Sequence, residues 1–256
     1  MDNIRPNCFE HTKISSCERS KLFCFHHAGG SASFFADWYR ELSPGVNVYP
    51  VQLKCRGFEE DMKPYGSLEE AGADIAQQIC QITRDSDHPF LFYGHSMGGV
   101  LAYLTADILQ REHGKGPEHL FVSGSIPTLG EITKVYGKSV TELSDEDFCE
   151  FLATCGAVDR RMLSIPQFHQ YFLPVIRSDF ELTENFKADP SRKLLCGVTV
   201  YGGSEDKIVK PPQLICWDDY TLASVQYHIL DGDHFFIKKH KKEICDEISR
   251  TMLKSI

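Results

Sequence analysis

The chain has 256 residues, of which 42% are hydrophobic and 11% aromatic, a composition that suits one α/β domain over residues 1–256 with a full apolar core. Its formal net charge of −9 argues against general nucleic-acid binding, because such binding needs a basic face that displaces counterions. No apolar run approaches the roughly 18 residues that a membrane-spanning helix requires, so no membrane association is expected.

The N-terminal stretch MDNIRPNCFEHTKISSCERS contains no apolar core of signal-peptide length. Ten cysteines are spread between Cys8 and Cys245 without CxxC pairs, and no ligands cluster at zinc-like spacing. We therefore expect a cytoplasmic protein with reduced thiols and no metal site. We also expect a monomer.

Short apolar runs alternate with helical patterns along the chain, which indicates βα units around a mostly parallel sheet. The runs expected to form strands are residues 22–25, 46–53, 89–93, 119–124, 194–201 and 225–230. Helices are expected at residues 34–42, 68–82, 100–112 and about 240–254. Ser67, with Glu70 three residues later, has the capping-box pattern of a helix start.

The stretch of about residues 130–190 differs from the rest because it contains no convincing strand. Ser144 is expected to cap one helix, and Pro174 is expected to kink a second, strongly aromatic one. A helical insertion between late strands of an α/β sheet can serve as a lid over the site or simply as a layer that covers the sheet. We favour the lid, because the segment is unusually rich in aromatic side chains.

The pattern Gly94-His95-Ser96-Met97-Gly98 matches G-x-S-x-G between a strand-like run and a helix-like run. In α/β-hydrolases this sequence forms the strained turn that exposes a nucleophilic serine, and the glycines avoid collisions at the flanking positions. The positive end of the following helix favours the negative charge that develops there. Ser96 is therefore the predicted nucleophile, whereas His95 is expected to support the turn.

The general base should be a histidine after the last strand, because the chain order in such folds is serine, acid, histidine. His228 falls inside the last predicted strand, and His240 falls at the basic start of the closing helix. His234 lies in the turn between them. His234 is therefore the predicted base.

The acid must hold the imidazole in the correct tautomer. Asp206 comes just past the end of a late strand and is the predicted acid, with Glu205 as its nearest rival. Asp231 and Asp233 adjoin the base in sequence, but neighbours in a turn rarely face each other. Their expected roles are turn formation and solvation.

An oxyanion hole needs two backbone N–H groups aimed at the developing charge. One is expected from Met97, directly after the nucleophile. The other is expected from the loop His26-His27-Ala28-Gly29-Gly30 after the first strand, with Ala28 as the predicted donor and His27 as the alternative.

These residues together resemble the type II thioesterases, the free-standing editing enzymes of nonribosomal peptide and polyketide synthases. The resemblance spans about residues 21–248 and rests on the segments FHHAGGSASFF, GHSMGG, YFLPVIRSDFELTENF, VYGGSEDKIV and GDHFF, in this order. It departs from the common Pro-Gly-Arg turn of that family, since the chain has Lys54-Cys55-Arg56-Gly57 and keeps only Arg56 clearly.

The resemblance implies an α/β-hydrolase fold with a mostly parallel central sheet, flanking helices and a flexible helical lid. It implies hydrolysis of acyl or aminoacyl thioesters on the phosphopantetheine arm of carrier protein domains, without a metal or dissociable cofactor. Ser96, Asp206 and His234 fall on the triad positions of that family.

Other functions of the same fold remain alternatives. They are a general carboxylesterase or acyl-CoA thioesterase, a serine acyltransferase, and a non-catalytic module that binds carriers. The basic run Lys238-Lys239-His240-Lys241-Lys242 could attract an acidic carrier domain, although a solvated helix face is the simpler interpretation.

Overall fold

The structure is a computed structural model that describes residues 8–9, 11–12, 17–56, 63–132 and 138–254. Its strands form one six-stranded sheet in the order β2-β1-β3-β4-β5-β6, and all neighbouring pairs run parallel. The strands are β1 (Ser20–Phe25), β2 (Val46–Pro50), β3 (Phe90–His95), β4 (His119–Ser123), β5 (Gly197–Gly203) and β6 (Val225–Leu230).

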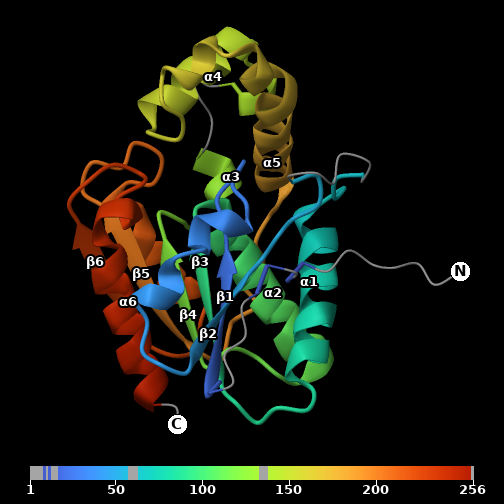
Figure 1. Cartoon of the computed structure of the whole chain (residues 1–256), viewed down its shortest axis with the longest axis vertical. Helices are drawn as coiled ribbons and strands as arrows, with labels where there is room; N and C mark the ends of the chain where they lie inside the picture. Colours follow the sequence, from blue (N-terminus) through green and yellow to red (C-terminus); the bar gives the residue numbers. More distant parts are fainter. Residues whose placement is uncertain (1–7, 10, 13–16, 57–62, 133–137, 255–256) are drawn as a thin grey trace, which may run out of the picture.

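Helices cover both faces of this sheet (Figure 1). Helices α1 (Leu68–Thr83) and α2 (Met97–His113) lie on one face, and α6 (Ile237–Lys254) lies on the other. The predicted parallel sheet with flanking helices is thus confirmed.

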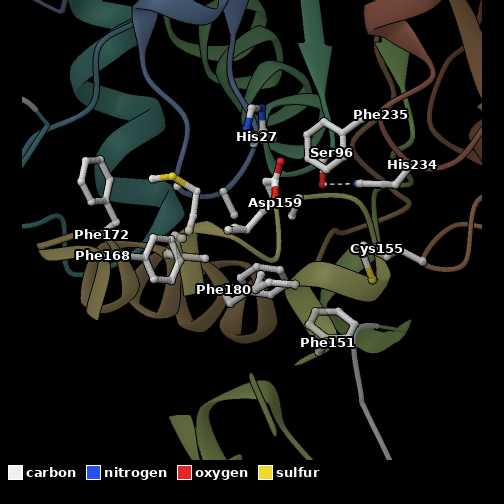
Figure 2. A pocket seen from close by; sticks show the side chains of 18 residues that line it. His27, Ser96, Phe151, Cys155, Asp159, Phe168, Phe172, Phe180, His234 and Phe235 are labelled. Carbon is white, nitrogen blue, oxygen red and sulfur yellow. Dashed lines mark hydrogen bonds between the residues drawn. The ribbon is translucent and has the colours of Figure 1, made fainter. Parts of the chain in front are cut away.

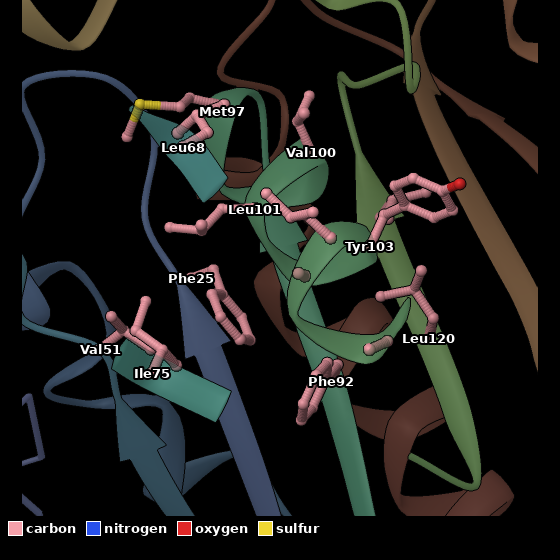
Figure 3. Packing of buried hydrophobic residues seen from close by; sticks show 14 of the residues in the cluster. Phe25, Val51, Leu68, Ile75, Phe92, Met97, Val100, Leu101, Tyr103 and Leu120 are labelled. Atoms are coloured by element: carbon pink, nitrogen blue, oxygen red, sulfur yellow. The ribbon is translucent and has the colours of Figure 1, made fainter. Parts of the chain in front are cut away.

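The last four residues of β1 show why a central strand of this sheet is apolar at successive positions. Phe23 and Phe25 belong to the cluster under α1 and α2, whereas Leu22 and Cys24 belong to the cluster under α6. Successive side chains of a strand point to opposite faces, so a strand buried on both faces has no polar side. Figure 3 shows the cluster on the α1–α2 face, where Phe25 and Phe92 meet residues of both helices.

Several predicted boundaries shift in the structure. In place of the helix expected at residues 34–42, the chain forms two short 3₁₀ turns, Ala32–Phe35 and Trp38–Arg40. Trp38 packs its ring 4.6 Å from that of the strand residue Tyr93, and this tertiary packing overrides the helical pattern. Strand β2 ends at Pro50 rather than at residue 53.

The start of α1 is capped as predicted, but the capping box forms only in part. Ser67 Oγ accepts a hydrogen bond of 3.1 Å from the Glu70 N–H. The Glu70 carboxylate accepts from the Gly66 N–H at 2.7 Å, one residue before the expected partner. Both bonds still occupy backbone donors that precede or begin the helix.

The segment between β4 and β5 lies beyond the carboxyl ends of the strands (Figure 1). It contains α3 (Leu129–Ile132), α4 (Asp145–Thr154) and α5 (Leu173–Asn185), and Ser144 caps α4 as predicted. Pro174 lies in the first turn of α5, directly after a π-helical turn over Phe168–Phe172. Where a kink is predicted, the helix type thus changes from π to α. We call the segment 129–185 the lid.

The lid has a small apolar cluster of its own, separate from the two clusters that flank the sheet. Its buried members are Val140, Leu143, Phe148, Cys149, Leu152, Phe168, Leu173 and Ile176. Arg177 of α5 binds the carbonyl oxygen of Val140 and the carboxylate of Asp145, and its guanidinium lies 4.5 Å from the Phe148 ring centroid. These contacts hold the lid together internally.

Across the described ranges of the chain, no helix combines the length and apolar character needed to cross a membrane.

Helix α4 packs in this separate small core, whereas Leu129 and Leu182 at the two ends of the lid belong to the cluster under α1 and α2. We therefore infer that α4 can move without disrupting the sheet. We expect the backbone amides of α4 to exchange with deuterium faster than those of β3. Hydrogen–deuterium exchange with mass spectrometry would measure both segments in one experiment. Equal protection of α4 and β3 would contradict a mobile lid and indicate a fixed cover.

Candidate active site

Ser96 lies in the sharp turn between β3 and α2. Its backbone has φ 55° and ψ −123°, a strained conformation for a residue with a side chain. A Cβ atom added at Gly94 would lie 2.3 Å from the carbonyl oxygen of Gly98, and one at Gly98 would lie 2.1 Å from that of Phe25. Only glycine therefore fits at either position, as the sequence pattern requires.

The structure brings Ser96, His234 and Asp206 together from three separate turns. Ser96 Oγ lies 2.9 Å from His234 Nε2, and His234 Nδ1 lies 2.7 Å from Asp206 Oδ2. The other carboxylate oxygen of Asp206 accepts the N–H groups of Ile208 and Val209 at 2.8 and 3.0 Å. Asp206 and His234 are buried, at 4% and 2% exposure, so water does not compete for these bonds.

This arrangement fixes which nitrogen of His234 carries the proton. The Asp206 carboxylate accepts the Nδ1–H, so the lone pair of Nε2 faces Ser96 Oγ and can take its proton. The geometry suits a general base acting on an activated serine.

The rival acids are directed elsewhere. Glu205 is exposed, Asp231 pairs with Lys239 and His240, and Asp233 accepts the N–H of Phe235 at 2.8 Å.

The rival histidines also have other partners. His228 stacks on Tyr201, with ring centroids 5.2 Å apart, and His240 bonds to Asp231 and Glu243. His95 is fully buried behind the turn, where its Nδ1 lies 2.9 Å from Ser123 Oγ. Burial, followed by the neighbouring His234, lowers the pKa of His95 well below its usual value, so the ring stays neutral.

Two hydrogen bonds orient the peptide that carries the predicted Ala28 donor. The His27 carbonyl oxygen lies 2.9 Å from the Gly30 nitrogen, which donates to it, and 2.8 Å from His26 Nδ1. In a trans peptide the Ala28 N–H points away from that oxygen. The Gly29 N–H is excluded as the donor, because it already binds Asp179 Oδ2 at 2.6 Å.

A cavity of about 250 Å³ opens in front of Ser96 and beneath the lid. Figure 2 shows Phe151, Phe168, Phe172 and Phe180 of the lid on the side facing Ser96. The lining is mostly apolar, as expected for a pocket that holds an acyl chain.

Two further lining residues of the lid were not identified from the sequence. Burial raises the pKa of the Cys155 thiol to about 12, so this thiol is unreactive at neutral pH. Asp159 brings a carboxylate to the cavity, where it binds the exposed Arg161. Neither residue belongs to a recognisable motif, because its position depends on how the lid folds back.

The basic run 238–242 is largely neutralised by the protein's own carboxylates. Lys241 pairs with Asp37 at 2.6 Å, Lys242 pairs with Asp246 at 2.9 Å, and Lys239 pairs with Asp231. These ion pairs favour the solvated helix face over a carrier-docking patch.

The chain matches one family model and several proteins that are named as thioesterases. The family model described as Thioesterase domain matches residues 20–252. The chain is 31% identical over 236 residues to Thioesterase PikA5 of Streptomyces venezuelae, an alignment that covers 91% of this chain and 81% of the relative.

Solved structures give the same result. The chain is similar to the RedJ thioesterase of the prodiginine biosynthetic pathway in Streptomyces coelicolor, with a TM-score of 0.80 and 30% identity over 91% of this chain and 86% of that one. It is also similar to the type II thioesterase BorB of the borrelidin biosynthetic cluster, with a TM-score of 0.78 and 27% identity over 94% and 96%. These likenesses support the predicted α/β-hydrolase fold.

Replacing the predicted nucleophile tests the site directly. We expect Ser96→Ala to lower kcat by about 10⁶, because no other group can form the acyl-enzyme. It should also abolish labelling by a fluorophosphonate probe, measured by intact mass. Labelling of the variant at a different serine would overturn the assignment.

Replacing Asp206 by asparagine tests its role as the acid, because the amide changes which nitrogen of His234 carries the proton. In Asp206→Asn, the Ile208 and Val209 N–H groups hold the amide oxygen, so the NH₂ group faces His234 Nδ1. That favours the wrong tautomer, and we expect kcat to fall by about 10⁴, as in serine proteases. Asp233→Asn and Glu205→Gln are the controls, and a comparable loss in Glu205→Gln would reassign the acid.

Proposed function

The chain belongs to the thioesterase family, and from this premise we propose that it works as a free-standing type II thioesterase. It hydrolyses acyl or aminoacyl thioesters on the phosphopantetheine arm of carrier proteins and so clears aberrant acyl units from a nonribosomal peptide or polyketide synthase. The observation that carries the proposal is the hydrogen-bonded chain from Ser96 through His234 to Asp206 beside an apolar, lid-covered cavity.

The proposed reaction follows the two halves of acyl transfer. Ser96 Oγ attacks the thioester carbonyl while its proton passes to His234 Nε2, and the Met97 and Ala28 N–H groups stabilise the oxyanion. The C–S bond then breaks, and the thiol of the carrier arm leaves with the proton from His234. Water attacks the acyl-enzyme with the same histidine as base, which releases the acid and restores Ser96.

We propose that no metal or dissociable cofactor takes part. The three side chains supply the nucleophile, the base and the group that orients it, so each proton transfer has a partner within the protein.

We further propose that the protein acts as a cytoplasmic monomer, without nucleic acid or membrane partners. The ten cysteines include no CxxC pair, and the formal charge is −9. Many cysteines without paired spacing suit a reducing compartment. The negative charge disfavours binding to polyanions such as nucleic acids.

The cavity supports modest selectivity among acyl groups. Its aromatic lining accepts apolar chains by burial, and one methylene changes such binding by only about 1–3 kcal/mol. An editing enzyme benefits from this tolerance, because blocked carriers bear different acyl units.

Carrier dependence separates the proposal from the acyl-CoA thioesterase and esterase alternatives. We expect a higher kcat/KM for one short acyl group on a carrier protein than on coenzyme A at matched salt. Both carry the same arm, so the difference comes from contacts remote from the reacting carbon and from repulsion between the nucleotide phosphates and a protein of charge −9. Screening limits the repulsion beyond about 10 Å at 0.1 M salt.

A truncated pantetheine thioester serves as the control, since it lacks both the carrier and the nucleotide. Equal kcat/KM values for carrier and coenzyme A substrates would contradict the proposal and favour a general hydrolase. An acylated acceptor among the products, in place of free acid, would indicate an acyltransferase.

A further inference from the structure

A buried ion pair joins the lid to the body of the protein beside the site. Arg56 follows β2, Asp179 belongs to α5, and their side chains are 7% and 4% exposed. One guanidinium nitrogen, Nη2, lies 2.5 Å from each carboxylate oxygen. Neither residue touches the triad, and the reaction described above does not use them.

Both partners of the ion pair also bind the loop that carries the Ala28 donor. Asp179 Oδ2 accepts the Gly29 N–H at 2.6 Å, and Arg56 Nε donates to the Gly30 carbonyl oxygen at 3.0 Å. Gly29 has φ +74°, and a Cβ atom there would lie 2.4 Å from Cγ1 of Ile176, so α5 packs directly against this loop.

The peptides around Ala28 are therefore held from both sides. The preceding peptide is fixed through the His27 carbonyl oxygen, which lies within hydrogen-bond distance of Gly30 N and His26 Nδ1. The following peptide is fixed through the Gly29 N–H, whose acceptor comes from the lid. Without Asp179 the Gly29 N–H loses its acceptor, and the loop that carries Ala28 is then held only through the His27 carbonyl oxygen and the Gly30 carbonyl oxygen.

We propose that Asp179 and Arg56 are positioning residues that orient the Ala28 N–H in the oxyanion hole, so that docking of α5 completes the hole. The inference rests on the proposed function through the role given to Ala28. A buried ion pair is seldom needed for stability, since apolar residues of similar volume replace such pairs without loss. What the pair adds here is a set of directed hydrogen bonds to the loop.

The test needs a variant that removes these bonds without leaving a buried charge. Arg56→Met/Asp179→Leu replaces both partners by apolar side chains and should keep a Tm close to that of the wild type. We expect its kcat/KM for p-nitrophenyl acetate to fall about 10²-fold, because a shift on the order of 1 Å in a catalytic group costs that much. Acetate is too short to depend on the aromatic lining of the lid.

An ion pair between α5 and α4 provides the matched control. Arg177→Met/Asp145→Ala removes an ion pair within the lid that has no contact with the loop. It should leave acetate hydrolysis unchanged. The conservative pair Arg56→Gln/Asp179→Asn keeps a donor and an acceptor at these positions and should recover most of the lost activity.

The outcomes are distinct. A folded Arg56→Met/Asp179→Leu protein with wild-type acetate hydrolysis would overturn the proposal. A rise in KM for long acyl esters alone would also overturn it, because this pattern indicates a simple lid tether. Since p-nitrophenyl acetate needs neither carrier nor coenzyme A, the result is independent of whether carrier thioesters are the preferred substrates.

Discussion

The site depends on the backbone conformation of Ser96. A positive φ between a buried strand and a helix is costly, and it persists because glycines on both sides allow close approach of the surrounding backbone. The contact of Gly98 with the end of β1 brings the start of α2 next to the loop at residues 26–30. One turn thus holds Ser96 at the end of β3 and places Met97 close to the loop that contains Ala28, the predicted second donor.

The parallel arrangement of the strands brings the acid and the base of the triad to the same edge of the sheet as Ser96. The loops after β1, β3, β5 and β6 all leave the carboxyl edge of the sheet, so residues far apart in sequence meet there. Asp206 follows β5 and His234 follows β6, and these are adjacent strands at one end of the sheet. The imidazole consequently reaches Ser96 while its carboxylate partner stays buried behind it.

The sequence was informative wherever the chemistry depends on a local pattern. The turn around Ser96 has both of its required glycines within five residues, so the sequence alone identifies the nucleophile. The ends of the late strands limit the candidates for the acid and the base, so the sequence also predicts Asp206 and His234. The helix predicted at residues 34–42 is wrong, because the packing of the Trp38 ring on Tyr93 decides the conformation of this stretch. The contact between Arg56 and Asp179 spans 123 positions and has no local signal that pairs the two side chains.

The apolar lining of the cavity affects the release of the product. Among the lining residues that the structure describes, Asp159 is the only carboxylate, and none is a lysine or an arginine. The reacting thioester group is uncharged, whereas hydrolysis turns it into a carboxylic acid that ionises at neutral pH. An apolar chamber without a counterion solvates such an anion poorly. Product inhibition should consequently be weak, and the carboxylate formed at Ser96 is driven back into water.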